Sequence, residues 1–442
     1  MTPTEADDMA KMATRKHTRK KLERASLLTA APPNAENAPM NRNLATAKAA
    51  KQDEFYTRYV DIQKEVEAYL EFDPDTFRGK VVYCNCDDPF ESNFFKYFAA
   101  NFNKLGLKKL VTTSYDGSPI AGAQLTFFEY DEGNGQRRKP KAIAVEIEEV
   151  KDLNGDGATG IEDVKLFLKR NPHSRTRLAG GGDFRSAECV ELLKQSDIVV
   201  TNPPFSIFRE YVALLVKHRK NFLIIGNTNS ITYKDIFPLI KNNRLWLGCT
   251  NFNVGMFFEV PDDWKHFHHI DEETGRKIAR VSTSCWYTNL DHGRRHHPLN
   301  LMNMAENLRF SKNLRGKAAY ERYDNYDAIE VGTYKEIPSD YDGMMGVPIT
   351  FLDKYNPDQF EILGYEKSYH LQTRKYEMQV QVDKSGKKSD VTKLNDGVAI
   401  KVDRPPTDQT YYVVDGEYYI QQYKRIFIQR CRARSARKEA KK

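Results

Sequence analysis

The segment Asn202-Pro203-Pro204-Phe205 has the composition of a site that binds a planar amine. It follows the apolar run Asp197–Thr201, which predicts a short buried strand ending at this turn. Proline lacks an N–H group and restricts the residue before it, so the turn can aim the Asn202 side-chain oxygen and a main-chain carbonyl at one point. Two converging acceptors suit an amino group that donates both of its hydrogens. Phe205 can stack on the planar ring that carries this amino group. The motif is typical of methyl transfer to an exocyclic amine, although these four residues alone also fit an ordinary strand-ending turn.

Two acidic residues follow other predicted strands. Asp88 comes after the apolar run Lys80–Cys86, and Asp116 comes after Leu107–Tyr115. In open α/β sheets, ligands bind outside the carboxyl ends of the strands. A carboxylate after the first strand can pair with the ammonium group of an amino-acid-like cofactor, and one after the second strand can hold ribose hydroxyls. For any single acid in a loop, exposure to solvent is the alternative interpretation.

Asp183 follows three consecutive glycines, Gly180–Gly182, and precedes Phe184. Glycine has no Cβ atom, so the backbone of such a run can approach a ligand closely. An aspartate at this position can accept a hydrogen bond from the amino group of a purine. The alternative interpretation is a glycine-rich hinge without a ligand.

Strands and helices alternate along residues 53–292. This alternation, with continuous apolar strands, is typical of an α/β fold whose mostly parallel sheet is covered by helices on both faces. Residues 117–181 interrupt the pattern and are interpreted as an insertion. The strand-rich end of the region predicts a hairpin at one sheet edge. The expected strands are Lys80–Cys86, Leu107–Tyr115, Asp197–Thr201, Asn221–Asn227, Leu245–Cys249, Met256–Val260 and Ser282–Asn289.

Within the insertion, residues 152–157 match the start of a calcium-binding loop. Asp152, Asn154 and Asp156 supply oxygen ligands at positions 1, 3 and 5, and a glycine at position 6 allows the sharp turn. Asp163 takes position 12, where a bidentate glutamate is usual, and no clear helix precedes the loop. The pattern therefore favours an Asx-type turn, with calcium as the less favoured alternative.

A change in composition beyond residue 292 predicts a second, smaller domain at about 293–442. Arg294, Arg295 and His296, together with Asn325 and Tyr326, have the chemistry for phosphate and base contacts. A solvated loop is the alternative for the basic cluster. Residues 1–52 lack hydrophobic periodicity and are interpreted as a disordered basic tail. The chain also ends in a basic segment, and both segments could bind phosphates.

Composition limits the class of protein. The chain has 442 residues, 40% of them hydrophobic, and a net charge of +7, which permits a sizeable core and a nucleic-acid partner. The six cysteines form no CxxC pair and have no zinc spacing. We find neither a secretory signal nor a run of about 20 apolar residues. We therefore expect a cytoplasmic protein without membrane spans.

The run from Asp53 to about Leu363 resembles the EcoRI-like adenine-specific DNA methyltransferases. Long matching segments carry this resemblance. They are DEFYTRYVDI (53–62), KVVYCNCDDPFESNFFKYFAANFNKLGLKKL (80–110), GDFRSAE (182–188), SDIVVTNPPFSIFREY (196–211), FLIIGNTNSITYKDIFPLIKNNRLWLG (222–248), YDNYDAIEV (323–331) and DYDGMMGVPITFLDKYNPDQFEIL (340–363).

The resemblance implies a Rossmann-like class I methyltransferase sheet with an insertion and a smaller C-terminal DNA-recognition domain. It also implies S-adenosyl-L-methionine as methyl donor, and it makes residues 202–205 the catalytic motif. Related enzymes often have two glycines where this chain has Ser92 and Phe94, which puts the detailed cofactor contacts in doubt. The predicted cofactor-binding residues are Phe55, Tyr56, Thr57, Asp88, Phe90, Asp116, Asp183 and Phe184.

The activity implied is site-specific methylation of N6 of a flipped-out adenine in double-stranded DNA. The enzyme would be a monomer, bacterial or phage-encoded, acting in restriction-modification or alone, with a cognate restriction endonuclease as a candidate partner and no metal. Two alternatives stay open from the residues. An Asn-Pro-Pro-aromatic motif also serves enzymes that methylate protein glutamine at N5, and the sheet could belong to a catalytically inactive DNA-binding protein.

Overall fold

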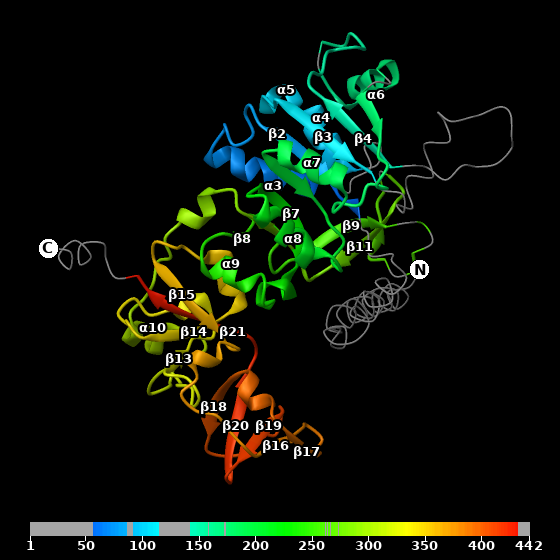
Figure 1. The fold of residues 1–442 in the computed structure, drawn as a ribbon. Coiled ribbons are helices and arrows are strands. Elements are labelled where there is room, and N and C mark those ends of the chain that lie inside the picture. The colour runs from blue at the N-terminus through cyan, green and yellow to red at the C-terminus, as the bar shows by residue number, and fades with distance from the viewer. Residues whose placement is uncertain are drawn as a thin grey trace, which may run out of the picture. The chain divides into compact units, whose positions relative to one another are not determined.

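Figure 1 shows the computed structural model of the chain, which divides into two units, Met1–Glu54 and Phe55–Lys442. The described residues are 56–85, 92–114, 142–157, 159–171, 174–260, 262, 264–265, 267–272 and 274–431, all in the second unit. Residues 1–52 and 432–442 lie outside them. So do four of the predicted cofactor residues, Phe55, Asp88, Phe90 and Asp116.

The largest sheet among the described residues has eight strands in the order β5-β4-β3-β2-β6-β7-β12-β8. β2 (Val81–Asn85), β3 (Lys109–Thr113), β6 (Ile198–Thr201) and β7 (Asn221–Asn227) run parallel at its centre. The chain first adds β3 on one side of β2 and later adds β6 on the other side. Such a reversal opens a crevice at the carboxyl ends of the two strands, where ligands bind in this kind of sheet. The α/β prediction is confirmed.

Antiparallel strands complete both edges of this sheet. β4 (Ile143–Ile147) pairs with β3, and β5 (Arg175–Arg177) pairs with β4. At the other edge β12 (Ser284–Thr288) lies between β7 and β8 (Trp246–Leu247) and is antiparallel to both. The predicted hairpin at one sheet edge is not present as a hairpin, because β8 and β12 pair antiparallel but strands of another sheet, within residues 256–281, lie between them in the chain.

One predicted member of this sheet lies elsewhere. β9 (Met256–Val260) forms a separate four-stranded sheet with β1 (Tyr56–Thr57), β11 (Lys277–Val281) and β10 (His269–Ile270). Its alternating burial, with Phe257 and Glu259 partly exposed, is typical of a sheet covered on one face. The small sheet brings the predicted cofactor residues Tyr56 and Thr57 alongside a segment about 200 residues further along the chain.

Helices follow the strands much as their apolar spacing predicts. In α8, for example, Phe208, Tyr211, Val212 and Leu215 are buried at the i, i+3, i+4, i+7 spacing of one helix face. The side chain of Ser92 caps α4 by accepting from two backbone N–H groups at 3.1 and 3.4 Å. Among the described residues no helix is both long and apolar enough to cross a membrane. The helices are α3 (Tyr59–Phe72), α4 (Asn93–Ala100), α5 (Phe102–Leu105), α6 (Ile161–Arg170), α7 (Ala187–Gln195), α8 (Phe208–Lys217), α9 (Phe237–Lys241) and α10 (Met304–Phe310).

Two further sheets follow residue 292. One has the order β13-β14-β21-β15 and the other the order β17-β16-β19-β20-β18. Their strands are β13 (Ala328–Glu330), β14 (Met344–Pro348), β15 (Phe360–Tyr365), β16 (Gln379–Val382), β17 (Lys388–Val391), β18 (Val398–Val402), β19 (Tyr411–Val414), β20 (Glu417–Gln422) and β21 (Arg425–Arg430).

The hydrophobic interior is continuous across residue 292. One buried cluster contains Ile224 of β7, Phe237 of α9 and Ile428 of β21. The Phe237 ring also packs against Tyr365 of β15, with ring centroids 4.5 Å apart. A boundary between a catalytic part and a recognition part at 292/293 therefore stays a prediction, since packing does not separate the two.

The start of α8 is fixed by a close approach between a helix and the sheet. A Cβ atom on Gly226 of β7 would lie within 3 Å of three atoms of the Phe208 ring, so this ring covers a strand position that only glycine leaves open. The Phe208 ring also packs against Tyr287 of β12, with ring centroids 5.0 Å apart. Phe208 thereby anchors the helix that begins just after residues 202–205.

Substitution of Gly226 tests this anchor. We expect Gly226→Ala to lower the free energy of unfolding by about 1–3 kcal/mol, because overpacking displaces the Phe208 ring. Phe208→Leu should recover part of this loss when added to Gly226→Ala. Gly332→Ala, at an exposed glycine where an added Cβ atom would meet only one atom at 3.4 Å, is the control and should change stability little. Denaturant unfolding is measured for wild type, both single variants, the double variant and the control, and additive losses in the double variant would contradict the anchor.

Candidate active site

The carboxyl ends of three parallel strands are joined by buried hydrogen bonds. The Thr201 hydroxyl, at the end of β6, donates to the main-chain carbonyl of Asn85 at the end of β2. The Asn85 side-chain oxygen accepts from Thr113 of β3 at 3.2 Å, and the Thr113 hydroxyl lies 3.1 Å from that of Tyr83. All four side chains are buried. The network fixes the edge of the sheet from which residues 202–205 emerge.

The predicted catalytic motif lies between β6 and α8 and is partly accessible. Asn202, Pro204 and Phe205 are half-buried, and Pro203 is buried. The turn is closed by the Ile207 N–H group, which donates to the Pro204 carbonyl at 3.1 Å. Asn202 is therefore the first residue beyond the anchored strand, at the switch point of the sheet.

The predicted cofactor residues Tyr56 and Thr57 are connected to the same edge of the sheet through α4. Asn93, the first residue of α4, donates from its side chain to the Thr57 carbonyl at 2.8 Å. Residues 86–91, between β2 and α4, contain the predicted Asp88 and Phe90 and lie outside the described residues. Tyr56 and Thr57 are thus tied to the helix that follows this loop. Among the described residues the buried Thr57 hydroxyl has no hydrogen-bond partner, which leaves it able to bind a polar ligand.

Asp183 and Phe184 lie beside the first turn of α8. Arg185 bridges Asp183 and Glu210 of α8, with nitrogen–oxygen distances of 2.9 Å to each. The hydrogen bond from Arg185 lowers the pKa of the Asp183 carboxyl below its ordinary value. Phe184 is buried, and its ring packs against Tyr211 of α8, with ring centroids 5.2 Å apart. The glycine-rich segment is therefore tied to the helix that begins after the catalytic motif.

Three residues that organise this edge were not singled out from the sequence. Asn93 and Arg185 lie inside matching segments, but their partners are distant in sequence or in another element. Glu65 of α3 is fully buried and accepts the N–H groups of Cys249 and Thr250 at 2.7 Å each. Burial raises the pKa of Glu65 above its ordinary value. Its position on the apolar face of a helix was the one available signal.

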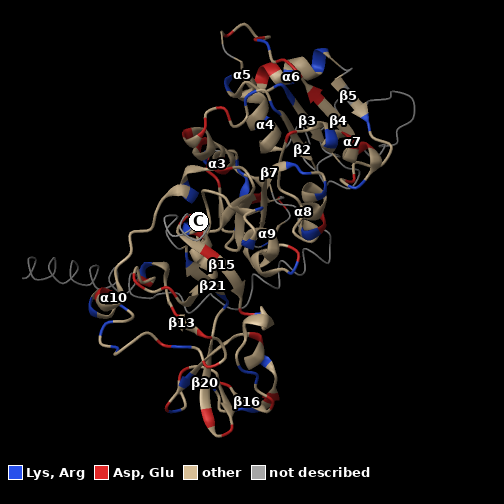
Figure 2. Ribbon diagram, turned by 60° about the vertical axis from the view of Figure 1, so that its left-hand side comes forward, with Lys and Arg blue, Asp and Glu red and all other residues tan. Residues whose placement is uncertain are grey.

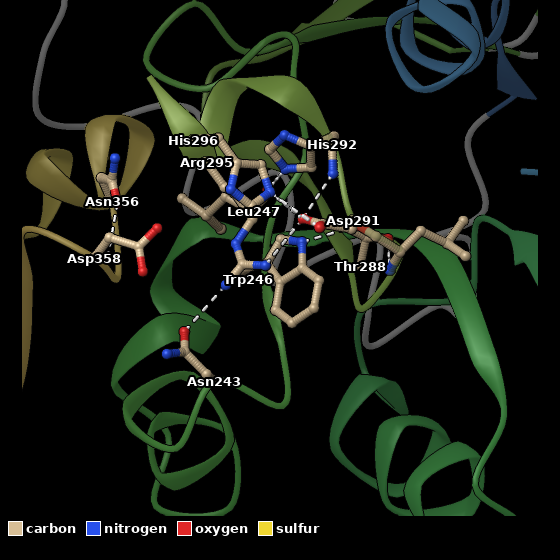
Figure 3. A network of polar contacts seen from close by, with 11 residues as sticks. Asn243, Trp246, Leu247, Thr288, Asp291, His292, Arg295, His296, Asn356 and Asp358 are labelled. Carbon is tan, nitrogen blue, oxygen red and sulfur yellow. Dashed lines mark hydrogen bonds and ion pairs between the residues drawn. The ribbon is translucent and has the colours of Figure 1, made fainter. Parts of the chain in front are cut away.

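The basic cluster after residue 292 is engaged in internal contacts, shown in Figure 3. The Arg295 side chain is 11% exposed, and its guanidinium lies 3.6 Å from the centroid of the Trp246 ring. It also donates to Asn243 at 3.1 Å and pairs with Asp291 at 3.2 Å. His296 contacts the same Asp291 carboxylate at 2.9 Å. These contacts hold the segment against the loops on either side of β8.

Arg294 joins two parts of the chain. It pairs with Asp353 at 2.9 Å and donates to the Cys249 carbonyl. DNA contact by Arg294, Arg295 and His296 stays a prediction, and the structure gives each of them a protein partner.

Asn325 and Tyr326, the other predicted DNA contacts, are buried. Asn325 donates to the Gly397 carbonyl and accepts from the Ala399 N–H group, both at 2.9 Å. The Tyr326 hydroxyl donates to the Glu366 carbonyl. Their hydrogen bonds thus connect the segment before β13 to β18 and to the segment after β15. The polar atoms of both residues therefore have a structural role within the protein.

The segment Asp152–Asp163 is closed by its own backbone. Asp152 accepts two backbone N–H groups at 2.6 and 2.9 Å, and Asp163 accepts three at 2.7, 2.8 and 3.1 Å. Asn154 donates to Asp156 at 2.9 Å. These bonds form Asx-type turns at the start of α6. In the described part of the chain no group of three or more His, Cys, Asp or Glu residues is placed to hold a metal ion.

Comparison with known proteins gives extensive matches. The family model described as adenine-specific methyltransferase EcoRI matches residues 43–429. The chain is 44% identical over 342 residues to the Type II methyltransferase M.EcoRI of Escherichia coli, covering 75% of this chain and 91% of that protein. It is 39% identical over 321 residues to M.MpnI of Mycoplasma pneumoniae, covering 72% and 83%. M.MgeORF184P of Mycoplasma genitalium is 35% identical over 321 residues, covering 72% and 84%. No solved structure gives a significant match.

An amine-binding motif at the ligand edge of an α/β sheet fits a methyltransferase that acts on an amino group. The chain belongs to the EcoRI family of adenine-specific methyltransferases. It is an adenine-specific DNA methyltransferase, which confirms the function implied by the matching segments. Membership also implies S-adenosyl-L-methionine as methyl donor. The comparisons give no support to protein glutamine as the substrate.

Substitution of Arg295 separates a structural role from DNA contact. We expect Arg295→Ala to lower the free energy of unfolding by about 2 kcal/mol, because the cation–π contact with Trp246 and the hydrogen bonds to Asn243 and Asp291 are lost. The control is His297→Ala, at an exposed position in the same cluster, which should leave stability nearly unchanged. Unchanged unfolding with weaker DNA binding in Arg295→Ala would instead support direct contact.

His292 makes stability depend on pH. Burial lowers its pKa to about 4 from 6.5, and the neutral ring hydrogen-bonds the Leu247 carbonyl at 3.1 Å. The unfolded chain binds this proton at higher pH than the folded chain, so stability is lost as pH falls from about 6.5 to 4. At about 1.4 kcal/mol for each pKa unit, the difference between 6.5 and about 4 makes the loss at most about 3.5 kcal/mol.

Unfolding measured between about pH 7 and pH 4.5 tests this dependence. His292→Phe should remove most of it, since phenylalanine carries no titrating group. An equally steep fall in His292→Phe would assign the pH dependence to other groups.

Proposed function

We propose that the Asn202 side-chain oxygen and the Pro203 carbonyl accept the two N6 hydrogens of an adenine extruded from double-stranded DNA. The main support for this proposal is the position of residues 202–205 at the carboxyl end of β6. Residues 202–205 follow β6 without an intervening residue, and the Thr201–Asn85 hydrogen bond anchors β6 at the switch point. Acceptors held in this way keep one geometry during the reaction, and such positioning contributes much of an enzyme's rate.

Extrusion of the base is required because N6 lies inside the stacked duplex. Flipping a base out of the duplex costs a few kcal/mol. Stacking of the extruded base on an aromatic ring returns about 1–3 kcal/mol. Phe205 is half-buried and follows the acceptors directly, so its ring can take this role.

The chemistry needs little beyond these acceptors. Two hydrogen bonds accepted from N6 draw electron density toward its lone pair and orient it for attack. The methyl donor, when bound, supplies an electrophilic methyl group, and N6 forms the new bond in line with the bond that breaks. The Asn202 and Pro203 oxygens hold N6 until one of its hydrogens leaves as a proton, which passes to solvent water.

Two described features support cofactor binding at this edge. The unpartnered, buried Thr57 hydroxyl can bind a polar group, and the ionised Asp183 carboxylate can accept from a purine amino group. Both are tied to elements that flank the catalytic motif. We propose that Phe55, Tyr56, Thr57, Asp88, Phe90, Asp116, Asp183 and Phe184 bind S-adenosyl-L-methionine on a Rossmann-like class I methyltransferase sheet.

We further propose that the chain methylates double-stranded DNA as a monomer and protects it from a restriction endonuclease of the same specificity. The description of its relatives as Type II methyltransferases supports this proposal. Sequencing host DNA for modified adenines, after expression of the chain, would identify the target sequence.

Asn202→Ala is the decisive substitution. We expect it to lower the rate of methyl transfer at least about a hundredfold, because a polar group positioned at the reacting centre is lost. Binding of S-adenosyl-L-methionine, measured by calorimetry, should largely survive. Asn300→Ala, at an exposed position outside the motif, is the matched control and should keep full activity. Wild-type turnover by Asn202→Ala would refute the assignment.

A further inference from the structure

Tyr423 is the most exposed aromatic residue among the described residues of the C-terminal region. It lies in the two-residue link between β20 and β21, where the chain passes from the five-stranded to the four-stranded sheet. Its side chain is 68% exposed. An exposed tyrosine offers a ring on which a base can stack.

This exposed ring stands on a rigid base. The next residue but one, Arg425, is buried and forms a bidentate ion pair with Glu330 of β13, with its Nη2 and Nε atoms 2.6 and 3.0 Å from the two carboxylate oxygens. The Arg425 Nη1 atom donates to the Tyr423 carbonyl at 2.6 Å. Buried charge pairs of this kind hold one geometry, because breaking them leaves an uncompensated charge. The backbone of Tyr423 is therefore fixed, while its ring is exposed to solvent with the Lys424 Nζ atom 5.9 Å from its centroid.

The link also reaches the catalytic sheet. The Lys424 Nζ atom lies 3.4 Å from both the Asn229 side-chain oxygen and the Thr232 hydroxyl. These two residues belong to the turn Thr228–Thr232, which directly follows β7. β7 is the parallel neighbour of β6, from which the catalytic motif emerges. The Tyr423–Lys424 link thus contacts the turn that extends the carboxyl edge of the sheet.

Charge alone does not locate the DNA on this protein. Figure 2 shows Lys and Arg interspersed with Asp and Glu along the described ribbon. An exposed ring on a fixed backbone next to the catalytic edge is a more specific feature. Side chains that insert between bases are apolar or aromatic and act as wedges that partly unstack the duplex.

We propose that Tyr423 enters the duplex beside the target and stacks on the bases that flank the extruded adenine. The inference rests on the proposed function, which requires the adenine to leave the helix. Extrusion leaves the neighbouring base pairs without a stacking partner. A ring that takes this place stabilises the extruded state and keeps the adenine near Asn202. Lys424 holds the link against the catalytic edge.

The test compares paired and unpaired targets. Single-turnover methylation is measured on a duplex of the identified target sequence and on the same duplex with an abasic position opposite the target adenine. We expect Tyr423→Ala to slow methylation of the paired duplex about tenfold, which is the scale of one base–aromatic stacking contact. On the abasic duplex Tyr423→Ala should regain nearly the wild-type rate, because an unpaired base costs less to extrude. Tyr423→Phe should act like wild type on both.

One control variant tests whether the loss of any exposed ring slows methylation. Phe310→Ala removes another exposed ring, 61% exposed on α10, and should affect neither duplex. Equal slowing of Tyr423→Ala on both duplexes would show that the residue supports the fold, and no slowing on the paired duplex would show that it is not needed. Either result overturns the proposal.

A separate measurement distinguishes this proposal from the proposed function. Asn202→Ala does not carry out the chemistry, so base extrusion is followed in its background by the fluorescence of 2-aminopurine placed at the target position. Adding Tyr423→Ala should reduce this fluorescence. If the wild-type chain bound DNA without methylating adenine, the proposed function would fail. In that case, equal binding of a mixed-sequence duplex by wild type and Tyr423→Ala would overturn the present proposal as well.

Discussion

The hydrogen bond from the Thr201 hydroxyl to the Asn85 carbonyl is the interaction on which the candidate active site depends. β2 and β6 are neighbours in the sheet but are separated by more than 110 residues of chain, and each ends at this bond. Asn202 follows one partner and the loop of residues 86–91 follows the other. Because both groups are buried, neither can exchange its partner for water without cost. A single buried contact therefore fixes where the predicted catalytic and cofactor segments leave the sheet.

Buried polar groups extend this constraint outward from the sheet. Asn85 engages Thr113 of β3, Asn93 engages β1, and Glu65 of α3 holds the loop after β8 through three donors. Gly248, in the same loop, has no room for a Cβ atom because Glu65 and Trp286 fill the space. A buried carboxylate destabilises a fold unless its hydrogen bonds are satisfied. These groups favour one arrangement of the edge and disfavour others.

The sequence predicts the parallel core well, because apolar runs and helix periodicity are local signals. β7 spans the predicted Asn221–Asn227, and β6 ends at the predicted Thr201. It predicts less well where a residue's partner is distant in the chain. Arg294 pairs with Asp353, and Arg295 stacks on Trp246, so a basic cluster that suits DNA is engaged within the protein. β9 was assigned to the wrong sheet for a similar reason, since its partner β1 lies about 200 residues earlier.

The same long-range contacts bear on how recognition and catalysis are related. Arg294 joins the loop after β8 to Asp353, Lys241 of α9 donates to the Leu363 carbonyl at 2.6 Å, and Phe237 packs on Tyr365. The four-stranded C-terminal sheet is therefore packed against the catalytic sheet rather than tethered to it by a linker. DNA bound by the C-terminal region would lie in a fixed register with Asn202. In such an arrangement the choice of adenine follows from geometry, because only the base at one distance from the recognised sequence can reach the motif.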